Sequence, residues 1–119
     1  MSSGVLVVDD DPTFRILVCR LLITSGLAVV GEAGTVATAI AAAHELRPSA
    51  ALVDVGLPDG DGITLAGELS ALPWRPRVLL TSTDPEAAST ADVRRSGAGG
   101  FFPKDQLPNA PLARLLTMA

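Results

Sequence analysis

The chain has 119 residues, of which 48% are hydrophobic and 3% aromatic, and its formal net charge is -4. This length and composition predict one domain, residues 1–119, with an aliphatic core, while the acidic balance argues against direct nucleic-acid binding, which needs a basic face. No apolar run approaches the roughly 20 residues of a membrane span, and the N-terminus has no secretion-signal pattern. The single cysteine, Cys19, rules out an internal disulfide. We therefore expect a soluble cytoplasmic domain.

Short and nearly continuous apolar runs recur along the chain at a regular spacing. Such runs are typical of strands that are buried on both faces, as in a parallel sheet. The predicted strands are Val5–Val8, Leu27–Val30, Ala50–Val53, Val78–Leu80 and Phe101–Phe102.

A first segment of helical length follows the first of these strands. Asp11 and Pro12 have the residue types of an N-cap and of the first helical position, and Ser25-Gly26 supplies the glycine that commonly ends a helix. Between them, apolar residues recur at intervals of three and four and predict one apolar helix stripe, made of Phe14, Leu17, Val18, Leu21 and Leu22.

Four further helices are predicted after the remaining strands. An alanine-rich helix spans about 36–46 and ends before Pro48, and another spans about 61–71 after the turn-rich sequence PDGDG. A helix over about 85–96 is stopped by Gly97, and a weaker one spans about 107–117. Strands that alternate with helices predict right-handed βαβ crossovers, and therefore a doubly wound α/β domain with a five-stranded parallel sheet and five helices.

Ligands of such a fold lie beyond the carboxyl ends of the strands. The side chains expected at that edge are Asp9 and Asp10 after the first strand, Asp54 after the third, Thr81 after the fourth and Lys104 after the fifth. Three carboxylates in one crevice suit a hard cation, and Mg2+ prefers such oxygen ligands. The sequence therefore predicts a Mg2+ site in which Asp10 and Asp54 bind directly and Asp9 acts through water.

Two more features of this edge bear on its chemistry. The backbone carbonyl of Gly56 is near enough in sequence to Asp54 to add a metal ligand. A carboxylate beside a divalent cation can also act as a nucleophile toward phosphorus. A phosphoryl group needs donors around its oxygens, and the hydroxyl of Thr81 and the ammonium of Lys104 suit that role.

These residues lie in four blocks that together resemble the receiver domain of bacterial two-component response regulators. The blocks are the pair Asp9-Asp10, LVDVGLPDGDG around Asp54, LLTS with Thr81, and GAGGFFPKD with Phe101 and Lys104. Their order and spacing match the family from Val5 to about Leu116. The resemblance implies the flavodoxin-like receiver fold with strand order 2-1-3-4-5.

The resemblance also implies a role for each position. Asp54 is the expected phosphoacceptor, phosphorylated from the histidine of a sensor histidine kinase, with Mg2+ bound by Asp10 and assisted by Asp9. Thr81 is expected to bond the phosphoryl oxygen and to move when it arrives, and Lys104 to pair with the phosphoryl group.

Phe101 is the aromatic switch residue that the resemblance implies, with a rotamer that follows Thr81. The surface of helix 85–96, strand 101–102 and helix 107–117 would then change and contact a partner or a second copy in a homodimer. The resemblance extends to receivers attached to helix-turn-helix regulators, and both a stand-alone receiver and an isolated domain stay open. Gly56 and Thr83 occupy the positions that tune the phosphoryl lifetime in relatives, so that lifetime stays open too.

Two other functions remain as alternatives. A Mg2+-dependent phosphohydrolase of the aspartyl-phosphate type shares the nucleophile and the metal, but it would carry a second acid–base aspartate where this chain has Gly56. A degenerate receiver that serves only as a protein-interaction scaffold would not need the acidic pair, Asp54, Thr81 and Lys104 together.

Several nearby residues are interpreted as structural. Asp11 reads as a helix cap rather than a ligand. PDGDG resembles a calcium loop but misses its ligand pattern, so Asp59 and Asp61 are interpreted as turn and N-cap residues with a mild electrostatic effect at most. Trp74, between two prolines, is interpreted as a packing residue.

Overall fold

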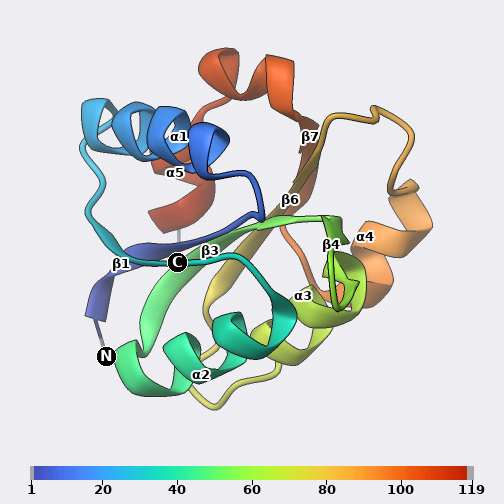
Figure 1. The fold of residues 1–119 in the computed structure, drawn as a ribbon, viewed down its shortest axis with the longest axis horizontal. Helices are drawn as coiled ribbons and strands as arrows, with labels where there is room; N and C mark the ends of the chain where they lie inside the picture. The colour runs from blue at the N-terminus through green and yellow to red at the C-terminus, as the bar shows by residue number, and fades with distance from the viewer. Residues whose placement is uncertain (1, 118–119) are drawn as a thin grey trace.

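The computed structural model describes residues 2–117 as one parallel sheet between two layers of helices (Figure 1). The order of the strands in this sheet is β2-β1-β3-β6-β7. The strands are β1 (Ser2–Val8), β2 (Val29–Ala33), β3 (Pro48–Asp54), β6 (Arg77–Ser82) and β7 (Gly100–Pro103). Because β6 and β7 are the fourth and fifth strands of the main sheet, the predicted fold class and strand order are confirmed.

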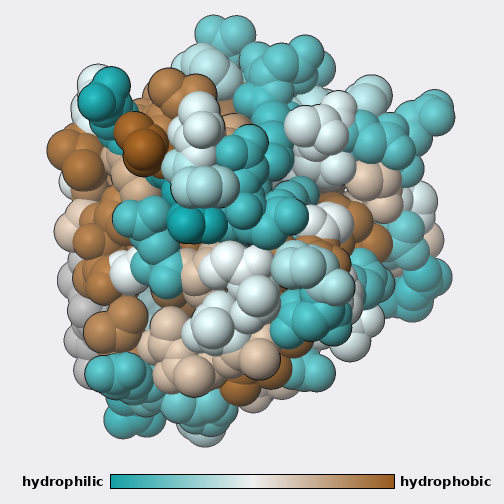
Figure 2. Space-filling model, viewed as in Figure 1, coloured by the Kyte–Doolittle hydropathy of each residue, from teal (hydrophilic) through white to brown (hydrophobic). Residues whose placement is uncertain are grey.

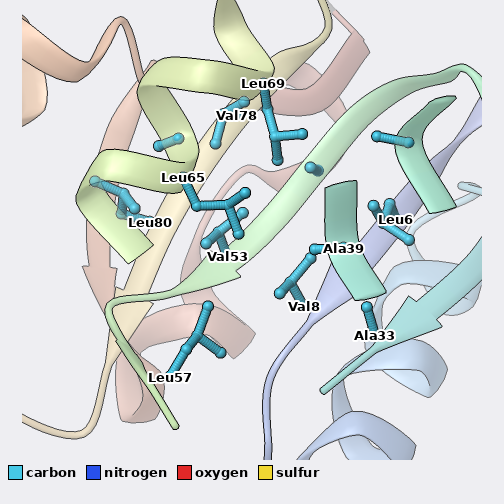
Figure 3. Packing of buried hydrophobic residues seen from close by; sticks show 13 residues of the cluster. Leu6, Val8, Ala33, Ala39, Val53, Leu57, Leu65, Leu69, Val78 and Leu80 are labelled. Carbon is cyan, nitrogen blue, oxygen red and sulfur yellow. The ribbon is translucent and has the colours of Figure 1, made fainter. Parts of the chain in front are cut away.

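Helices cover both faces of this sheet, as the apolar runs require. On one face lie α1 (Pro12–Thr24), the 3-10 helix η1 (Lys104–Asn109) and α5 (Leu112–Thr117). On the other lie α2 (Val36–Leu46), α3 (Gly62–Ser70) and α4 (Thr90–Ser96). Alternate strand residues enter two separate cores: Val5, Val7 and Leu52 pack under α1 and α5, and Val8 and Val53 pack under α2 and α3 (Figure 3).

The first helix follows the sequence prediction at both ends, and only part of its apolar stripe is buried. Asp11 is the N-cap and accepts a hydrogen bond from the Thr13 N–H at 3.0 Å, and Gly26 follows the helix with a φ of +89°. Val18 and Leu22 are buried, whereas Leu17 is 58% exposed. The apolar stripe is therefore wider than the strip of helix that meets the sheet, and Leu17 lies on its exposed side.

The fourth and fifth helices are shorter than predicted. Helix α4 begins at Thr90 instead of near residue 85, because Ser89 and Asp92 form a capping box there. Helix α5 begins at Leu112 instead of Leu107, and residues 104–109 form η1 in its place. Pro111 lacks an N–H and favours an extended residue before it, which separates the two helices at Ala110.

A short hairpin that was not predicted lies between β3 and α3. It pairs β4 (Gly56–Leu57) with β5 (Gly60–Asp61) in antiparallel register. Two residues per strand are too few for a periodic pattern to be visible in the sequence. Asp61 is the N-cap of α3, as predicted, and its side chain accepts from the Ile63 N–H at 3.0 Å.

Trp74 lies at the opposite edge of the sheet from the carboxyl ends of the strands. Its indole N–H donates to the Pro48 carbonyl at 2.9 Å, and the Arg47 guanidinium stacks 4.6 Å from the ring centroid. These contacts join the end of α2 to the start of β3, which confirms the packing interpretation. No helix within residues 2–117 combines the length and the apolarity that a membrane crossing demands.

Candidate functional site

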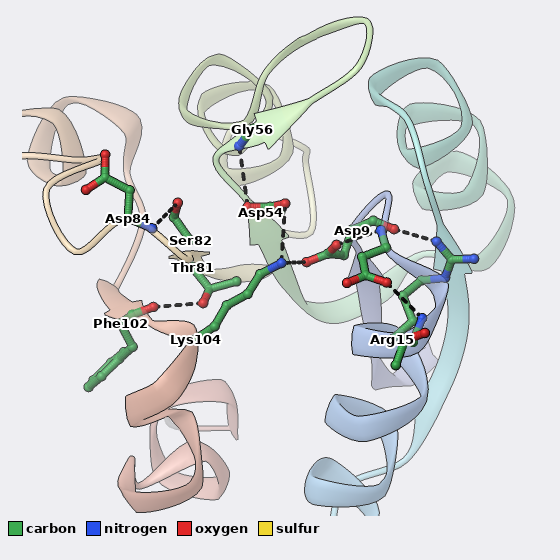
Figure 4. A network of polar contacts seen from close by, with 11 residues as sticks. Asp9, Arg15, Asp54, Gly56, Thr81, Ser82, Asp84, Phe102 and Lys104 are labelled. Carbon is green, nitrogen blue, oxygen red and sulfur yellow. Dashed lines mark hydrogen bonds and ion pairs between the residues drawn. The ribbon is translucent and has the colours of Figure 1, made fainter.

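The parallel strands deliver the predicted side chains to one edge of the sheet. Val8 pairs with Val53 in register, and Asp54 pairs with Thr81, so the residues that end β1, β3 and β6 lie side by side. Carboxylate oxygens of Asp9, Asp10 and Asp54 all come within 4.8 Å of one another. The three carboxylates that the sequence assigned to one crevice are therefore together, and Figure 4 shows two of them, Asp9 and Asp54.

Asp9 is the most deeply buried of the three carboxylates, with 1% of its surface exposed. Its Oδ1 accepts from the Asp11 N–H at 2.9 Å. Its Oδ2 is also buried and lies 2.7 Å from the ammonium of Lys104. A buried carboxylate is costly unless a cation compensates it, and Lys104 supplies part of that compensation.

Lys104 supplies positive charge to this crevice from the end of β7. Its Nζ lies 2.7 Å from Oδ2 of Asp9 and 3.6 Å from Oδ2 of Asp54, and its side chain is 13% exposed. The same Nζ lies 4.1 Å from the centroid of the Phe14 ring, a favourable cation–π geometry. The ammonium thus lies between the two carboxylates (Figure 4) and also against the Phe14 ring of α1.

Asp54 is buried and carries a strongly perturbed carboxyl group. Burial raises the pKa of Asp54 to about 6, and the neighbouring Asp9 adds to the rise, while Lys104 and the Gly56 N–H oppose it. That N–H donates to Oδ1 of Asp54 at 3.4 Å, which is long for a hydrogen bond. At neutral pH the carboxylate is therefore mostly ionised but poorly compensated, which is a suitable state for a nucleophile.

Thr81 is buried beside Asp54, but its hydroxyl is directed elsewhere. The Thr81 Oγ1 donates to the Phe102 carbonyl at 2.8 Å, across the β6–β7 pair (Figure 4). Phe101, the next residue toward the amino end of β7, is half-buried and packs against the core under α3. The hydroxyl and the aromatic ring are thus linked through one strand.

Two residues that support the site, Arg15 and Gly62, were not singled out by the sequence. Arg15 on α1 donates from Nη1 to the Asp9 carbonyl at 2.5 Å and from Nε to Oε1 of Glu32 at 3.1 Å. A Cβ on Gly62 would lie 2.0 Å from the Asp54 carbonyl oxygen, so only glycine fits there. No pattern in a single sequence shows these long-range contacts.

Asp59 is the third supporting residue, and it exceeds the role first assigned to it. Asp59 lies in the turn of the β4–β5 hairpin, as predicted, but its carboxylate accepts from the N–H groups of Val36 and Ala37 at 2.7 and 3.1 Å. These hydrogen bonds lower the pKa of Asp59 below its usual value. The prediction of a mild electrostatic effect was incomplete, because the partners lie on α2.

The donor set of this crevice suits Mg2+. Three carboxylates offer hard oxygen ligands, and the single ammonium of Lys104 beside them leaves negative charge that a divalent cation can compensate. When bound, Mg2+ supplies positive charge to phosphoryl oxygens. Asp9, Asp10 and Asp54 are the side chains that would hold it, and the Gly56 carbonyl stays a predicted ligand.

Comparison with known proteins gives one consistent family. The model of the response regulator receiver domain matches residues 5–115. The chain is 43% identical to the DNA-binding transcriptional activator DevR/DosR of Mycobacterium tuberculosis over 88% of its own length and 48% of that protein. It is 29% identical to the chemotaxis protein CheY of Bacillus subtilis, with 87% of both chains covered.

Solved structures agree with these sequence relatives. The signal receiver domain of NarL from Mycobacterium tuberculosis superimposes with a TM-score of 0.81 at 34% identity, and 97% of this chain and 94% of that chain are covered. Most of the curated relatives are longer, and the chain spans about half of their length.

Proposed function

Because the chain belongs to the response regulator receiver family, we propose that it is a phosphorylation-dependent signalling switch whose phosphoacceptor is Asp54. The observation that carries this role is the state of Asp54. It is a buried carboxylate with a pKa near 6, next to Asp9 and Asp10 on one side and Lys104 on the other. With Mg2+ held by Asp9 and Asp10, the nucleophilic carboxylate would have a cation on each side, as phosphoryl transfer needs.

The chemical step transfers a phosphoryl group from a phosphohistidine of a sensor histidine kinase. An oxygen of the Asp54 carboxylate forms a bond to phosphorus, the phosphorus–nitrogen bond breaks, and the imidazole leaves with its electron pair and takes up a proton. Lys104 then pairs with a phosphoryl oxygen, and the Thr81 hydroxyl turns from the Phe102 carbonyl toward another. The product is an acyl phosphate in one-to-one ratio with the protein. Turnover as a hydrolase is disfavoured because Gly56 offers no acid–base group.

A chemical donor tests this proposal without the kinase. Wild-type protein incubated with Mg2+ and acetyl phosphate should gain one phosphoryl increment in intact mass, as acetate leaves. The increment should be lost with Asp54→Ala and when Mg2+ is chelated, and it should remain with Asp105→Ala, which removes an exposed carboxylate. An unmodified wild type that also fails to bind beryllofluoride would favour the scaffold alternative.

We place the donor kinase on the apolar face of α1. Ile16, Leu17 and Ile23 are 56%, 58% and 61% exposed, and apolar atoms gather over α1 at the upper left of Figure 2. Beside Leu17 a groove of about 310 Å³ runs between α1 and η1, and its wall includes Lys104. This apolar surface therefore adjoins the acceptor crevice, where the kinase must bring its phosphohistidine.

Two matched substitutions separate docking from chemistry. Leu17→Glu places a charge in the groove, whereas Ile23→Glu makes the same change at an equally exposed position of the same face but outside the groove, and should slow transfer less. With a histidine kinase that phosphorylates the wild type, Leu17→Glu should slow transfer about tenfold or more, because an unpaired charge in an apolar contact costs at least about 1.4 kcal/mol. Transfer from acetyl phosphate should be unchanged. Equal slowing with both donors would place the defect in the fold instead.

The output surface proposed is that of α4, β7 and α5. Thr81 holds the Phe102 carbonyl, and Phe101 packs toward α3, so a turn of the hydroxyl releases β7 next to this surface. A partner or a second copy then binds the changed surface. Light scattering with and without beryllofluoride tests dimerisation.

The DNA-binding activity named for DevR/DosR is that protein's own. For residues 1–119, taken as one receiver unit, we propose no DNA binding.

A further inference from the structure

Asp59 connects two parts of the molecule that are distant in sequence. It lies in the turn of the β4–β5 hairpin, and both its carboxylate oxygens accept from the first turn of α2, at Val36 N and Ala37 N. The third amide of that turn, Thr38 N, donates to the Thr35 hydroxyl at 3.0 Å. The three amides that begin α2 are therefore all satisfied, two of them by a side chain from the hairpin.

The hairpin needs such an anchor because it cannot hold itself. Each of its strands has two residues, and a hairpin of this size is unstable alone. Leu57 is 9% exposed and packs into the core. Gly60 approaches α2 so closely that a Cβ would lie 3.0 Å from Cγ2 of Val36. Asp59 adds the two hydrogen bonds that fix the tip of the hairpin against α2.

The base of the same hairpin forms one wall of the acceptor site. Gly56 donates its N–H to Oδ1 of Asp54, and its carbonyl is the predicted backbone ligand of Mg2+. A Cβ at Gly56 would find no atom within 4 Å, so no neighbour packs against this residue from the side-chain direction. Glycine is also the residue with the most backbone freedom. The position of its carbonyl therefore depends on what holds the rest of the hairpin.

We propose that Asp59 is a positioning residue for the cation site: it holds the β4–β5 hairpin on the amino end of α2 and thereby fixes Gly56, whose carbonyl would be a metal ligand. The proposal rests on the proposed function, because it assumes that the crevice binds Mg2+. Asp59 would act on the acceptor site through Gly56 and would make no direct contact with the metal.

The test compares Mg2+ affinity among folded variants by calorimetric titration. Asp59→Ala should weaken Mg2+ binding about tenfold, the lower end of the loss when a residue that orients a ligand is removed. Asp59→Asn, which keeps one acceptor oxygen, should fall between Asp59→Ala and the wild type. Thr35→Ala removes a cap from the same helix turn without touching the hairpin, and should leave the affinity at the wild-type value. Hydrogen exchange of the Gly56 amide should quicken only in the Asp59 variants.

The outcomes are distinct. A wild type that does not bind Mg2+ would overturn the proposed function, whereas equal affinities of the wild type and Asp59→Ala would overturn only the role of Asp59. An affinity loss that disappears at high salt would also overturn it, because that result would mark a general charge effect. If Asp59→Ala does not fold, the comparison of Asp59→Asn with Thr35→Ala decides.

Discussion

Replacing Asp54 by asparagine should stabilise the metal-free protein, although Asp54 is the proposed acceptor. The pKa of Asp54 rises from 3.8 to about 6 because the folded protein penalises its charge. A tenfold change in an equilibrium constant is worth about 1.4 kcal/mol, so this rise corresponds to about 3 kcal/mol. The side chain is only 9% exposed, which leaves little solvent screening to reduce that value. Asp54→Asn keeps the shape and removes the charge.

The effect should depend on pH in a defined direction. Because the folded pKa of Asp54 is raised, the penalty is absent below the unfolded pKa of 3.8 and complete above about 6. Urea unfolding followed by circular dichroism should therefore give Asp54→Asn an advantage of about 3 kcal/mol at pH 7.5 that disappears by about pH 3.5. Added Mg2+ should narrow the advantage at pH 7.5, because it binds the folded wild type.

An exposed carboxylate provides the matched control. Asp105→Asn makes the same chemical change on the surface of η1, and its stability should stay within about 0.5 kcal/mol of the wild type at either pH. The reasoning would be refuted if Asp54→Asn were no more stable than the wild type at pH 7.5, or if its advantage were the same at acid pH. Either result would mean that the fold tolerates the Asp54 charge without penalty.

Other substitutions test the remaining contacts. Gly62→Ala should cost about 3 kcal/mol or more and prevent phosphorylation, because its Cβ would meet the Asp54 backbone at 2.0 Å; chemical denaturation and intact mass check both effects. Trp74→Phe loses the indole hydrogen bond and should cost about 1 kcal/mol, with calorimetric Mg2+ affinity unchanged because the site is at the other edge of the sheet. Thr81→Val leaves the Phe102 carbonyl without its donor. This variant should still accept a phosphoryl group on Asp54, but hydrogen exchange in β7 should no longer change when the protein is phosphorylated.

The strands and the side chains at their ends could be predicted because both follow from local patterns. Buried parallel strands appear in a sequence as continuous apolar runs, and Asp9, Asp54 and Thr81 are the residues that directly follow three of those runs. The shape of α1 could be predicted less well, since the sequence does not tell how much of an apolar stripe the sheet covers. Leu17 belongs to the stripe and yet faces solvent.

Contacts between distant segments account for most of what was not predicted. The β4–β5 hairpin is too short to carry a periodic signal, and the capping of α2 by Asp59 links residues 23 positions apart. The loss of the first turns of α5 is a different case, because Pro108 and Pro111 are visible in the sequence. Their combined effect was underestimated: they favour the 3-10 helix η1 and an extended residue before α5 begins.

The present partners of Thr81 and Lys104 show where a change at Asp54 would reach the surface. From the sequence, both side chains were assigned to the phosphoryl group. In the structure, the Thr81 hydroxyl bonds the Phe102 carbonyl, and Lys104 pairs with Asp9 and Asp54. Accepting a phosphoryl group would alter both contacts, and both involve residues 102–104 at the end of β7. Two changes at one strand end would act on Phe101 and η1 together, which is why we expect the response to appear on the α4, β7 and α5 surface.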